Sequence, residues 1–143
     1  MNVVFFTDRD LGLQFPAILR DAGLSVERHR DHFAHNCDDA IWLSEVATRG
    51  WVALTHDSRI RYKPNELSAL VHHNATLLVI VGKAPNADLA RNFVNTLPRL
   101  LRFLVAHRPP VIGKVYRPAI AEFSRNAGVT GTVELWYPKP DND

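Results

Sequence analysis

The sequence predicts an α/β domain built around a mainly parallel β-sheet, and two observations carry this prediction. Short apolar runs alternate along the chain with segments whose apolar residues recur at helical spacing. Strands that alternate with helices in this rhythm normally form a parallel sheet with right-handed crossovers. The chain has 143 residues, close to the size of one domain, and 46% of them are hydrophobic, enough for one core.

Six short apolar segments predict the strands of this sheet. The first four alternate with the helical segments and should form its parallel part, whereas the last two are expected as late, antiparallel additions. In chain order the segments are NVVFF (2–6), LSVERH (24–29), WVALTHD (51–57), TLLVIVG (76–82), VIGKVYR (111–117) and GTVELWY (131–137).

Four segments with helical spacing predict the helices. Glycines end the first two of them, at Gly23 and Gly50, and Asp38 or Asp39 is the expected N-cap of the second. Pro98 should bend the last helix, since proline disrupts a helix interior. The segments are LGLQFPAILRDAG (11–23), DDAIWLSEVATRG (38–50), PNELSALVHHN (64–74) and ADLARNFVNTLPRLLRFLVAH (87–107).

Composition limits the class of protein. The formal net charge is only +2, which allows contact with a polyanion without requiring it. Cys37 is the single cysteine, which rules out a disulfide framework and favours a reducing compartment. The chain shows neither a long apolar run nor a signal-peptide pattern, so we expect a cytoplasmic protein without membrane association. We expect one domain over 1–137 and a disordered tail over 138–143.

Three aspartates fall where the predicted topology can gather them. Asp8 follows the first strand, Asp57 ends the third, and Asp39 opens the helix that leads into that strand. The start of a crossover helix lies on the same side as the end of the preceding strand. Ligands of such sheets bind beyond the carboxyl ends of the strands. We therefore expect Asp8, Asp39 and Asp57 to lie together at a binding edge.

Gathered carboxylates repel one another, and a divalent cation removes that cost. Mg²⁺ prefers oxygen ligands and uses one or two protein carboxylates, so the acids suit metal-assisted phosphoryl chemistry. Such a site is equally compatible with hydrolysis, phosphotransfer and simple metal binding. Each acid alone could be a cap or turn residue, and their joint placement favours a site. Asp10 is interpreted as the cap of the first helix, with metal ligation as the alternative.

Basic residues follow the last of these acids. Arg59, Arg61 and Lys63 occupy every second position, so in an extended segment they would share one face beside the metal. Arginine suits phosphate oxygens, and such contacts supply affinity without sequence choice. The residues are predicted to bind an RNA backbone, with Arg9 on the same rim. A solvated loop is the alternative.

Histidines and tryptophans form two further signals. The stretch HRDHFAHNC holds His29, His32, His35 and Cys37. A zinc site is one reading, but the spacing matches no known ligand pair, and a surface loop near the active edge is the preferred one. The tryptophans are predicted to lie in the core or at its edge: Trp42, Trp51 and Trp136.

The order of these features resembles PIN-domain ribonucleases, and more narrowly the short PIN-like proteins related to VapC-type toxins. The shared pattern is an acid after the first strand, then Asp39, a helix through Val46, Gly50, the strand WVAL and Thr55-His56-Asp57. The stretches FFTDRDLG and RIRYKPNE look like a short subgroup of the same proteins. The resemblance covers roughly residues 2 to 115.

The resemblance implies a three-layer PIN-like (Rossmann-like) fold with a mainly parallel central sheet and late added strands. It implies a Mg²⁺- or Mn²⁺-dependent endonuclease for single-stranded RNA, held inactive by an antitoxin and often dimeric. Asp8, Asp39 and Asp57 match three acids of the metal site, and Thr55 matches a supporting hydroxyl. The larger VapC-type proteins carry a further glutamate that has no clear counterpart here. Candidate substitutes are Glu27, Asp31 and Glu66.

Other classes of protein stay open at this point. A PIN-like binding module without catalytic activity would share every motif. A phospho-acceptor receiver domain could use Asp8, Asp10, Asp57 and Lys83, although no Ser or Thr ends the strand TLLVIVG. An aspartyl phosphatase of the Asp-x-Asp type is weaker, because Gly12 stands where Thr or Val is expected.

Overall fold

A computed structural model of the chain describes residues 2–119 and 130–139. Its centre is a six-stranded sheet with the order β2-β1-β3-β4-β5-β6. The first five strands are parallel and β6 runs antiparallel to β5, which confirms the predicted sheet. The strands are β1 (Val4–Thr7), β2 (Ser25–Arg28), β3 (Val52–Thr55), β4 (Thr76–Ile80), β5 (Val111–Tyr116) and β6 (Thr132–Tyr137).

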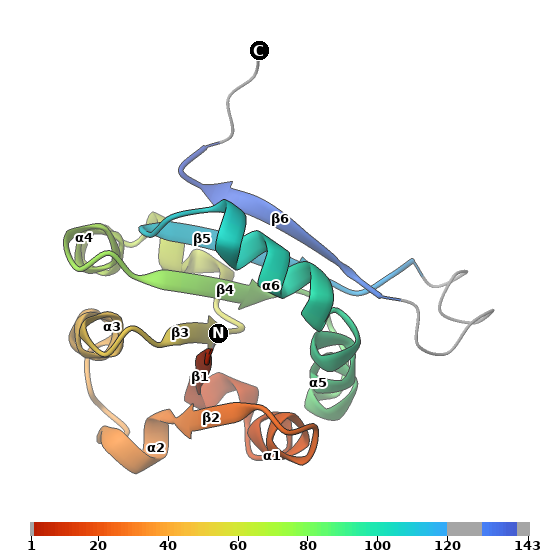
Figure 1. The fold of residues 1–143 in the computed structure, drawn as a ribbon. Helices are drawn as coiled ribbons and strands as arrows, with labels where there is room; N and C mark the ends of the chain where they lie inside the picture. The colour runs from red at the N-terminus through yellow and green to blue at the C-terminus, as the bar shows by residue number, and fades with distance from the viewer. Residues whose placement is uncertain (1, 120–129, 140–143) are drawn as a thin grey trace.

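Helices cover both faces of the sheet, so the fold has three layers, as Figure 1 shows. One face carries α1 (Gln14–Asp21), α5 (Asn86–Asn95) and α6 (Leu97–Ala106). The other carries α3 (Asp39–Thr48) and α4 (Pro64–His72), with the short α2 (His29–His32) beside them. The described residues also contain two 3₁₀ helices, η1 (Arg9–Leu11) and η2 (Ser58–Tyr62). Among the described helices, none has the length and apolar character needed to cross a bilayer.

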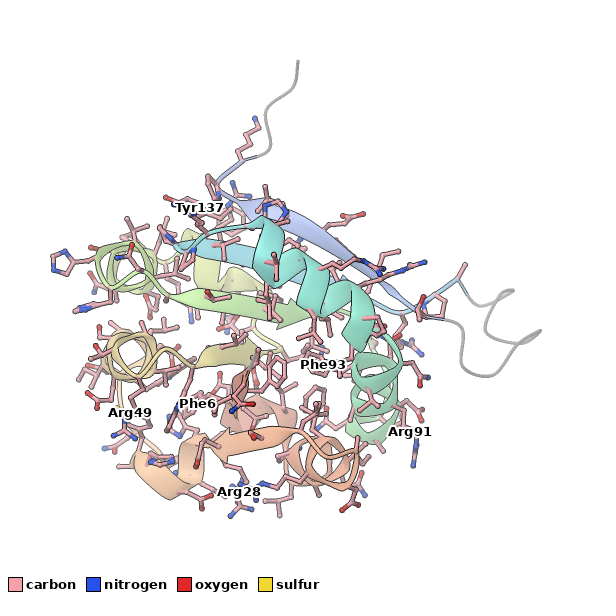
Figure 2. The ribbon with its side chains drawn as sticks, viewed as in Figure 1. Phe6, Arg28, Arg49, Arg91, Phe93 and Tyr137 are labelled. Atoms are coloured by element: carbon pink, nitrogen blue, oxygen red, sulfur yellow. The ribbon has the colours of Figure 1, made fainter. Side chains whose placement is uncertain are left out.

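The strands alternate their side chains between two apolar clusters, one under each helical layer. The ring centroid of Phe5 in β1 lies 5.2 Å from that of Phe93 in α5. The next residue, Phe6, has its ring centroid 5.4 Å from that of Trp42 in α3. Figure 2 shows Phe6 and Phe93 inside the molecule on opposite sides of the sheet. Trp42 is fully buried and the other two tryptophans pack at the edge of the core, as predicted.

The long helical segment is two helices and not one bent helix. α5 ends at Asn95 and α6 begins at Leu97, so the break comes before Pro98. Pro98 lies in the first turn of α6, where the missing N–H costs nothing because that position has no intrahelical acceptor. The predicted tail lies mostly outside the described residues, which end at 139.

The strand order creates a switch point between β1 and β3. From β1 the chain crosses one face through α1 to reach β2, and it crosses the other face through α3 to reach β3. The helices therefore diverge above the carboxyl ends of β1 and β3, where doubly wound sheets bind their ligands. This order also occurs in flavodoxin-like folds, so topology alone does not exclude a receiver domain.

Candidate active site

A cavity of about 600 Å³ lies at this switch point. Four carboxylates enter it: Asp8 after β1, Asp10 in η1, Asp39 at the start of α3 and Asp57 after β3. The structure thus brings together the three acids that the sequence placed at one edge, and adds Asp10. The other lining residues are Arg9, His29, His35, Cys37, His56, Ser58, Arg59 and Lys63.

Asp8 and Asp10 share one hydroxyl group. Oγ1 of the fully buried Thr55 lies 2.9 Å from Asp8 Oδ2 and 3.0 Å from Asp10 Oδ2. A hydroxyl has a single proton, so it satisfies only one of these carboxylates at a time. The backbone N–H of His56 also donates to Asp10 Oδ2 at 3.0 Å, and that of Arg9 donates to Asp8 Oδ1 at 2.8 Å.

Asp10 is therefore a cavity residue, and its predicted role as the cap of the first helix is wrong. The residue before α1 is Leu13, which makes no side-chain capping bond. A 3₁₀ turn, η1, lies between β1 and α1, and it rotates Asp10 back over the end of β3. The side chain of Asp8 caps this turn through the N–H of Arg9.

Two adjacent acids with few donors hold their protons more tightly than usual. Burial raises the pKa of Asp8 to about 7, the charge of Asp10 adds to the rise, and the hydrogen bonds from Thr55 and Arg9 act against it. Burial also raises the pKa of Asp10, against the hydrogen bonds from His56 and Thr55. At neutral pH a bound cation or a retained proton would therefore stabilise the part of the cavity formed by Asp8 and Asp10.

The other half of the cavity is already neutralised by Lys63. The Lys63 ammonium lies 3.0 Å from Asp57 Oδ2 and 3.8 Å from Asp39 Oδ2. Burial alone would raise the pKa of Asp57, but hydrogen bonds from Lys63 and Arg59 outweigh it, and the net shift is downward. Asp39 Oδ1 accepts a hydrogen bond from Trp42 Nε1 at 2.8 Å, which ties its orientation to the core.

The donor set suits a hard divalent cation, although it is not arranged as a finished site. Carboxylate oxygens are the ligands that Mg²⁺ prefers, and Asp8 and Asp10 supply two carboxylates that form no salt bridge within residues 2–119 and 130–139. In residues 2–119 and 130–139, no three histidine, cysteine or acidic side chains lie close enough to hold a metal as they stand. Asp39 and Asp57 are instead paired with the Lys63 ammonium.

The basic residues do not share one face, contrary to the prediction. The segment after Asp57 is the 3₁₀ helix η2 and not an extended strand, so positions two apart point in different directions. Lys63 and the highly exposed Arg59 reach the acids, whereas Arg61 lies over the Trp136 ring, 5.2 Å from its centroid. Arg9 is on the cavity wall, where its Nε donates to His29 Nδ1 at 2.8 Å.

The histidine-rich stretch is split by the fold, and it forms no zinc site among the described residues. His29 and His32 lie in α2, a helical turn that the sequence reading missed. His29 is buried, and burial lowers its pKa, as does the positive charge of Arg9. His32 pairs with Glu27 at 2.9 Å, whereas His35 and Cys37 follow α2 and line the cavity, as the loop interpretation placed them.

The candidate substitutes for the missing glutamate lie elsewhere. Glu27 pairs with His32 and Asp31 pairs with Arg28 on the exposed side of the β2–α2 region, and Glu66 is in the first turn of α4 without lining the cavity. The fourth acid that lines the cavity is Asp10. In the sequence, only its position two residues after Asp8 indicates that it belongs to the site. The direction of its side chain depends on the turn geometry of η1, which the sequence does not reveal.

The fold and the acid-lined switch point agree with the comparison of the chain with protein families. A family described as a PIN-like domain matches residues 3–82, which is more than half of the chain. The chain belongs to this family, which confirms the resemblance seen in the sequence. The match replaces the receiver hypothesis, and Lys83, which that hypothesis needed near the acids, is exposed and does not line the cavity.

A curated relative gives a narrower comparison. The protein named "Putative ribonuclease VapC45", from Mycobacterium tuberculosis (strain ATCC 25618 / H37Rv), is 33% identical over 89 residues. The aligned part is 59% of this chain and 62% of that relative, so the chain spans less than two thirds of its length. No solved structure matches the chain.

Proposed function

We propose that this chain is a metal-dependent endoribonuclease of PIN type that hydrolyses single-stranded RNA. The observation that carries the proposal is the meeting of four carboxylates with basic residues at the switch point of the sheet. An acid cluster alone would repel an RNA phosphate, whereas an acid cluster that holds a divalent cation attracts it. The ribonuclease name of the M. tuberculosis relative supports the same activity.

Asp8 and Asp10 would hold Mg²⁺ or Mn²⁺, because they are the two cavity acids that have no salt bridge in the part of the chain that the structure describes. Asp39 and Asp57 would join them when the Lys63 ammonium moves to the RNA phosphate. The bound ion would supply an activated water and offset the charge that builds up on the phosphoryl oxygens. Glu66 lies outside the cavity, and we leave it out of the ligand set.

Buried residues behind the cavity and basic residues on its wall would orient the acids and the RNA. Thr55 fixes the separation of Asp8 and Asp10, and the indole of Trp42 fixes Asp39. Arg59, 80% exposed at its side chain, and Lys63 would contact the phosphates on either side of the cleaved bond. Arg9 lines the inner wall of the cavity, where it would face the RNA backbone.

The biological role that we propose is that of the toxin of a type II toxin–antitoxin pair, acting in the cytoplasm. An antitoxin protein would then be its partner, and a homodimer its working form. A second candidate is a PIN-like module that binds RNA without cutting it. The ion pairs of Lys63 favour this second candidate, because they occupy two of the four acids.

Cleavage of a mixed RNA pool by the purified protein tests the proposal. Cleavage should need Mn²⁺ or Mg²⁺, stop in EDTA and disappear in Asp8→Asn. A matched control is Asp21→Asn, an exposed acid at the far end of α1, which should cleave like wild type. Cleavage that survives both EDTA and Asp8→Asn would overturn the assignment of the site. RNA binding without cleavage in every metal would establish the inactive module.

A further inference from the structure

An exposed aromatic cluster lies beside the cavity, at the end of η2. The side chain of Tyr62 is 71% exposed, and its ring centroid is 5.7 Å from that of Trp136 at an angle of 79°. The Arg61 guanidinium lies 5.2 Å and the Lys114 ammonium 3.9 Å from the Trp136 centroid. These residues, Arg61, Tyr62, Lys114 and Trp136, are called the Tyr62 platform here.

Three separate elements build the platform. Arg61 and Tyr62 end η2, Lys114 is in β5 and Trp136 is in β6. Ile112 of β5 packs into the core under α4, and side chains alternate along a strand, so Lys114 points to that same face. The other face of β6 packs against α6 through Val133 and Leu135. The platform thus lies on the α4 side of the sheet.

Folding does not explain the position of Tyr62. A ring that stays 71% exposed removes little apolar surface from water, so its contribution to stability is small. Trp136, by contrast, is partly buried against the core and holds the two cations through its ring. Among the described residues the Arg61 guanidinium makes no hydrogen bond, so its N–H groups are available to a ligand.

The charge around Tyr62 favours a polyanion with flat groups. Arg61 and Lys114 flank the ring system, and Lys63 comes next in the chain, about 3.8 Å along the backbone from Tyr62. The acid on this side of the two strands is Glu134, which is exposed and opposite Lys114 in the β5–β6 register. An aromatic ring bordered by cations is the arrangement with which proteins hold single-stranded nucleic acids.

We infer that Tyr62 stacks on an unpaired base of single-stranded RNA while Arg61 and Lys114 contact the neighbouring phosphates. The strand would leave the acid cavity past Lys63 and continue over the β5–β6 face. This inference rests on the proposed function, since it extends the path of the same substrate. A base in a duplex cannot reach Tyr62 in this way, so the platform selects unpaired RNA.

Binding without cleavage separates this inference from the proposed function. The probes are a fluorescently labelled single-stranded uridine homopolymer, an abasic strand of the same length, and an RNA duplex, all in EDTA. Tyr62→Ala should weaken binding of the homopolymer by about fivefold to a hundredfold, the loss expected for one base–aromatic stack. Tyr62→Phe should retain the wild-type affinity, because the ring is kept.

The abasic strand and the duplex provide the internal controls. Tyr62→Ala should bind both of them like wild type, because neither presents a free base. Val105→Ala, an exposed apolar residue of α6 on the opposite face, should leave all three affinities unchanged. Equal homopolymer affinity of Tyr62→Ala and wild type would overturn the inference and leave the platform to a protein partner. Equal losses on the homopolymer and the abasic strand would also overturn it.

The two hypotheses fail in distinguishable ways. If the protein cuts no RNA but Tyr62→Ala still lowers homopolymer affinity, the platform stands and the proposed catalysis falls. If the protein cuts RNA and Tyr62→Ala binds normally, catalysis stands and the platform falls. The thermal unfolding of Tyr62→Ala should match that of wild type, which separates loss of a contact from loss of the fold.

Discussion

At the scale of single residues, the cavity combines two acids that have no ion pair among the described residues with two that pair with a lysine. Asp8 and Asp10 share the Thr55 hydroxyl, whereas Asp39 and Asp57 share the Lys63 ammonium. The same carboxylate chemistry therefore gives opposite pKa shifts at positions after neighbouring strands, upward for Asp8 and downward for Asp57. Each of these two pairs of acids leads to a separate prediction.

The first prediction concerns the pH dependence of stability without metal. The folded state raises the pKa of Asp8 from its ordinary value near 4 to about 7, so between these values it binds a proton that the unfolded state has lost. Asp8 therefore lowers the free energy of unfolding as pH rises from about 4 to about 7, by at most about 4 kcal/mol. Asp8→Asn removes this loss and should be more stable than wild type near pH 8.

Urea unfolding in EDTA at several pH values measures this difference. Near pH 4 the two proteins should differ little, because Asp8 is then protonated in the folded state. The stability difference should grow in favour of Asp8→Asn up to about pH 7 and then stay constant. A constant difference over the whole range would show that Asp8 titrates normally.

The second prediction concerns Lys63. Lys63→Met removes the cation that holds Asp39 and Asp57, so both carboxylates become available and the field at the cavity becomes more negative. We expect tighter Mn²⁺ binding, by about tenfold for a gain of about 1.4 kcal/mol. Titration calorimetry of the purified variant measures it. Lys83→Met, which removes an exposed lysine outside the cavity, should bind Mn²⁺ like wild type, and equal affinities of all three proteins would contradict the role of Lys63.

At the scale of elements, short turns decide what the hydrophobic pattern leaves open. The strand ends could be located from the sequence because each apolar run stops at a polar residue, which placed Asp8 and Asp57 at one edge of the sheet. The directions of the Asp10 and Arg61 side chains could not be predicted from the sequence. Asp10 belongs to a 3₁₀ helix of three residues and Arg61 to one of five residues. Such turns have no periodic signature, and contacts with distant residues orient their side chains only in the folded chain. Asp10 accepts hydrogen bonds from Thr55 and His56, and Arg61 lies over the Trp136 ring.

The junction between α5 and α6 is a second element that the pattern hides. Thr96 stands between the two helices, fully buried. Its Oγ1 accepts a hydrogen bond from the backbone N–H of Gly131 at 2.9 Å and lies 3.3 Å from Asn92 Oδ1. The residue thus joins the helix junction to the chain just before β6.

The third prediction follows from that junction. Thr96→Val keeps the shape of the side chain but leaves the buried N–H of Gly131 without its acceptor, which should lower the free energy of unfolding by about 1–3 kcal/mol. Thr96→Ser keeps the hydroxyl and should lose less. Chemical denaturation of the three proteins measures the difference, and a Thr96→Val variant as stable as wild type would show that the contact contributes nothing.

At the scale of the whole molecule, a ligand that binds only the folded state should stabilise the entire domain. If Mg²⁺ or Mn²⁺ binds the acid cavity, a metal concentration about one hundred times its dissociation constant adds about 2.7 kcal/mol to the free energy of unfolding. For a chain of this size that raises the melting temperature by several degrees. Thermal unfolding with metal and with EDTA tests this fourth prediction.

The variants assign the effect to the cavity. Asp8→Asn and Asp10→Asn should lose most of the metal-induced rise, whereas Asp21→Asn at the other end of α1 should keep it. A similar rise in all four proteins would place the metal elsewhere on the surface. The sequence predicted this edge as the site because alternating strands and helices indicate a parallel sheet, in which the carboxyl ends of the strands lie at one edge. That β1 and β3 are direct neighbours is seen only in the structure.

The order in which the ribosome makes this protein gives the cavity one more property. Every residue that lines it lies between Asp8 and Lys63, so all of them are synthesised before α4, β4 and β5. The core beneath it is not complete then, because β3 is buried only when β4 covers its edge and the apolar cluster on the α1 face continues to Val115. The acids of the cavity are therefore synthesised before the strands that complete the core, and they reach their folded arrangement only after β5 has been made.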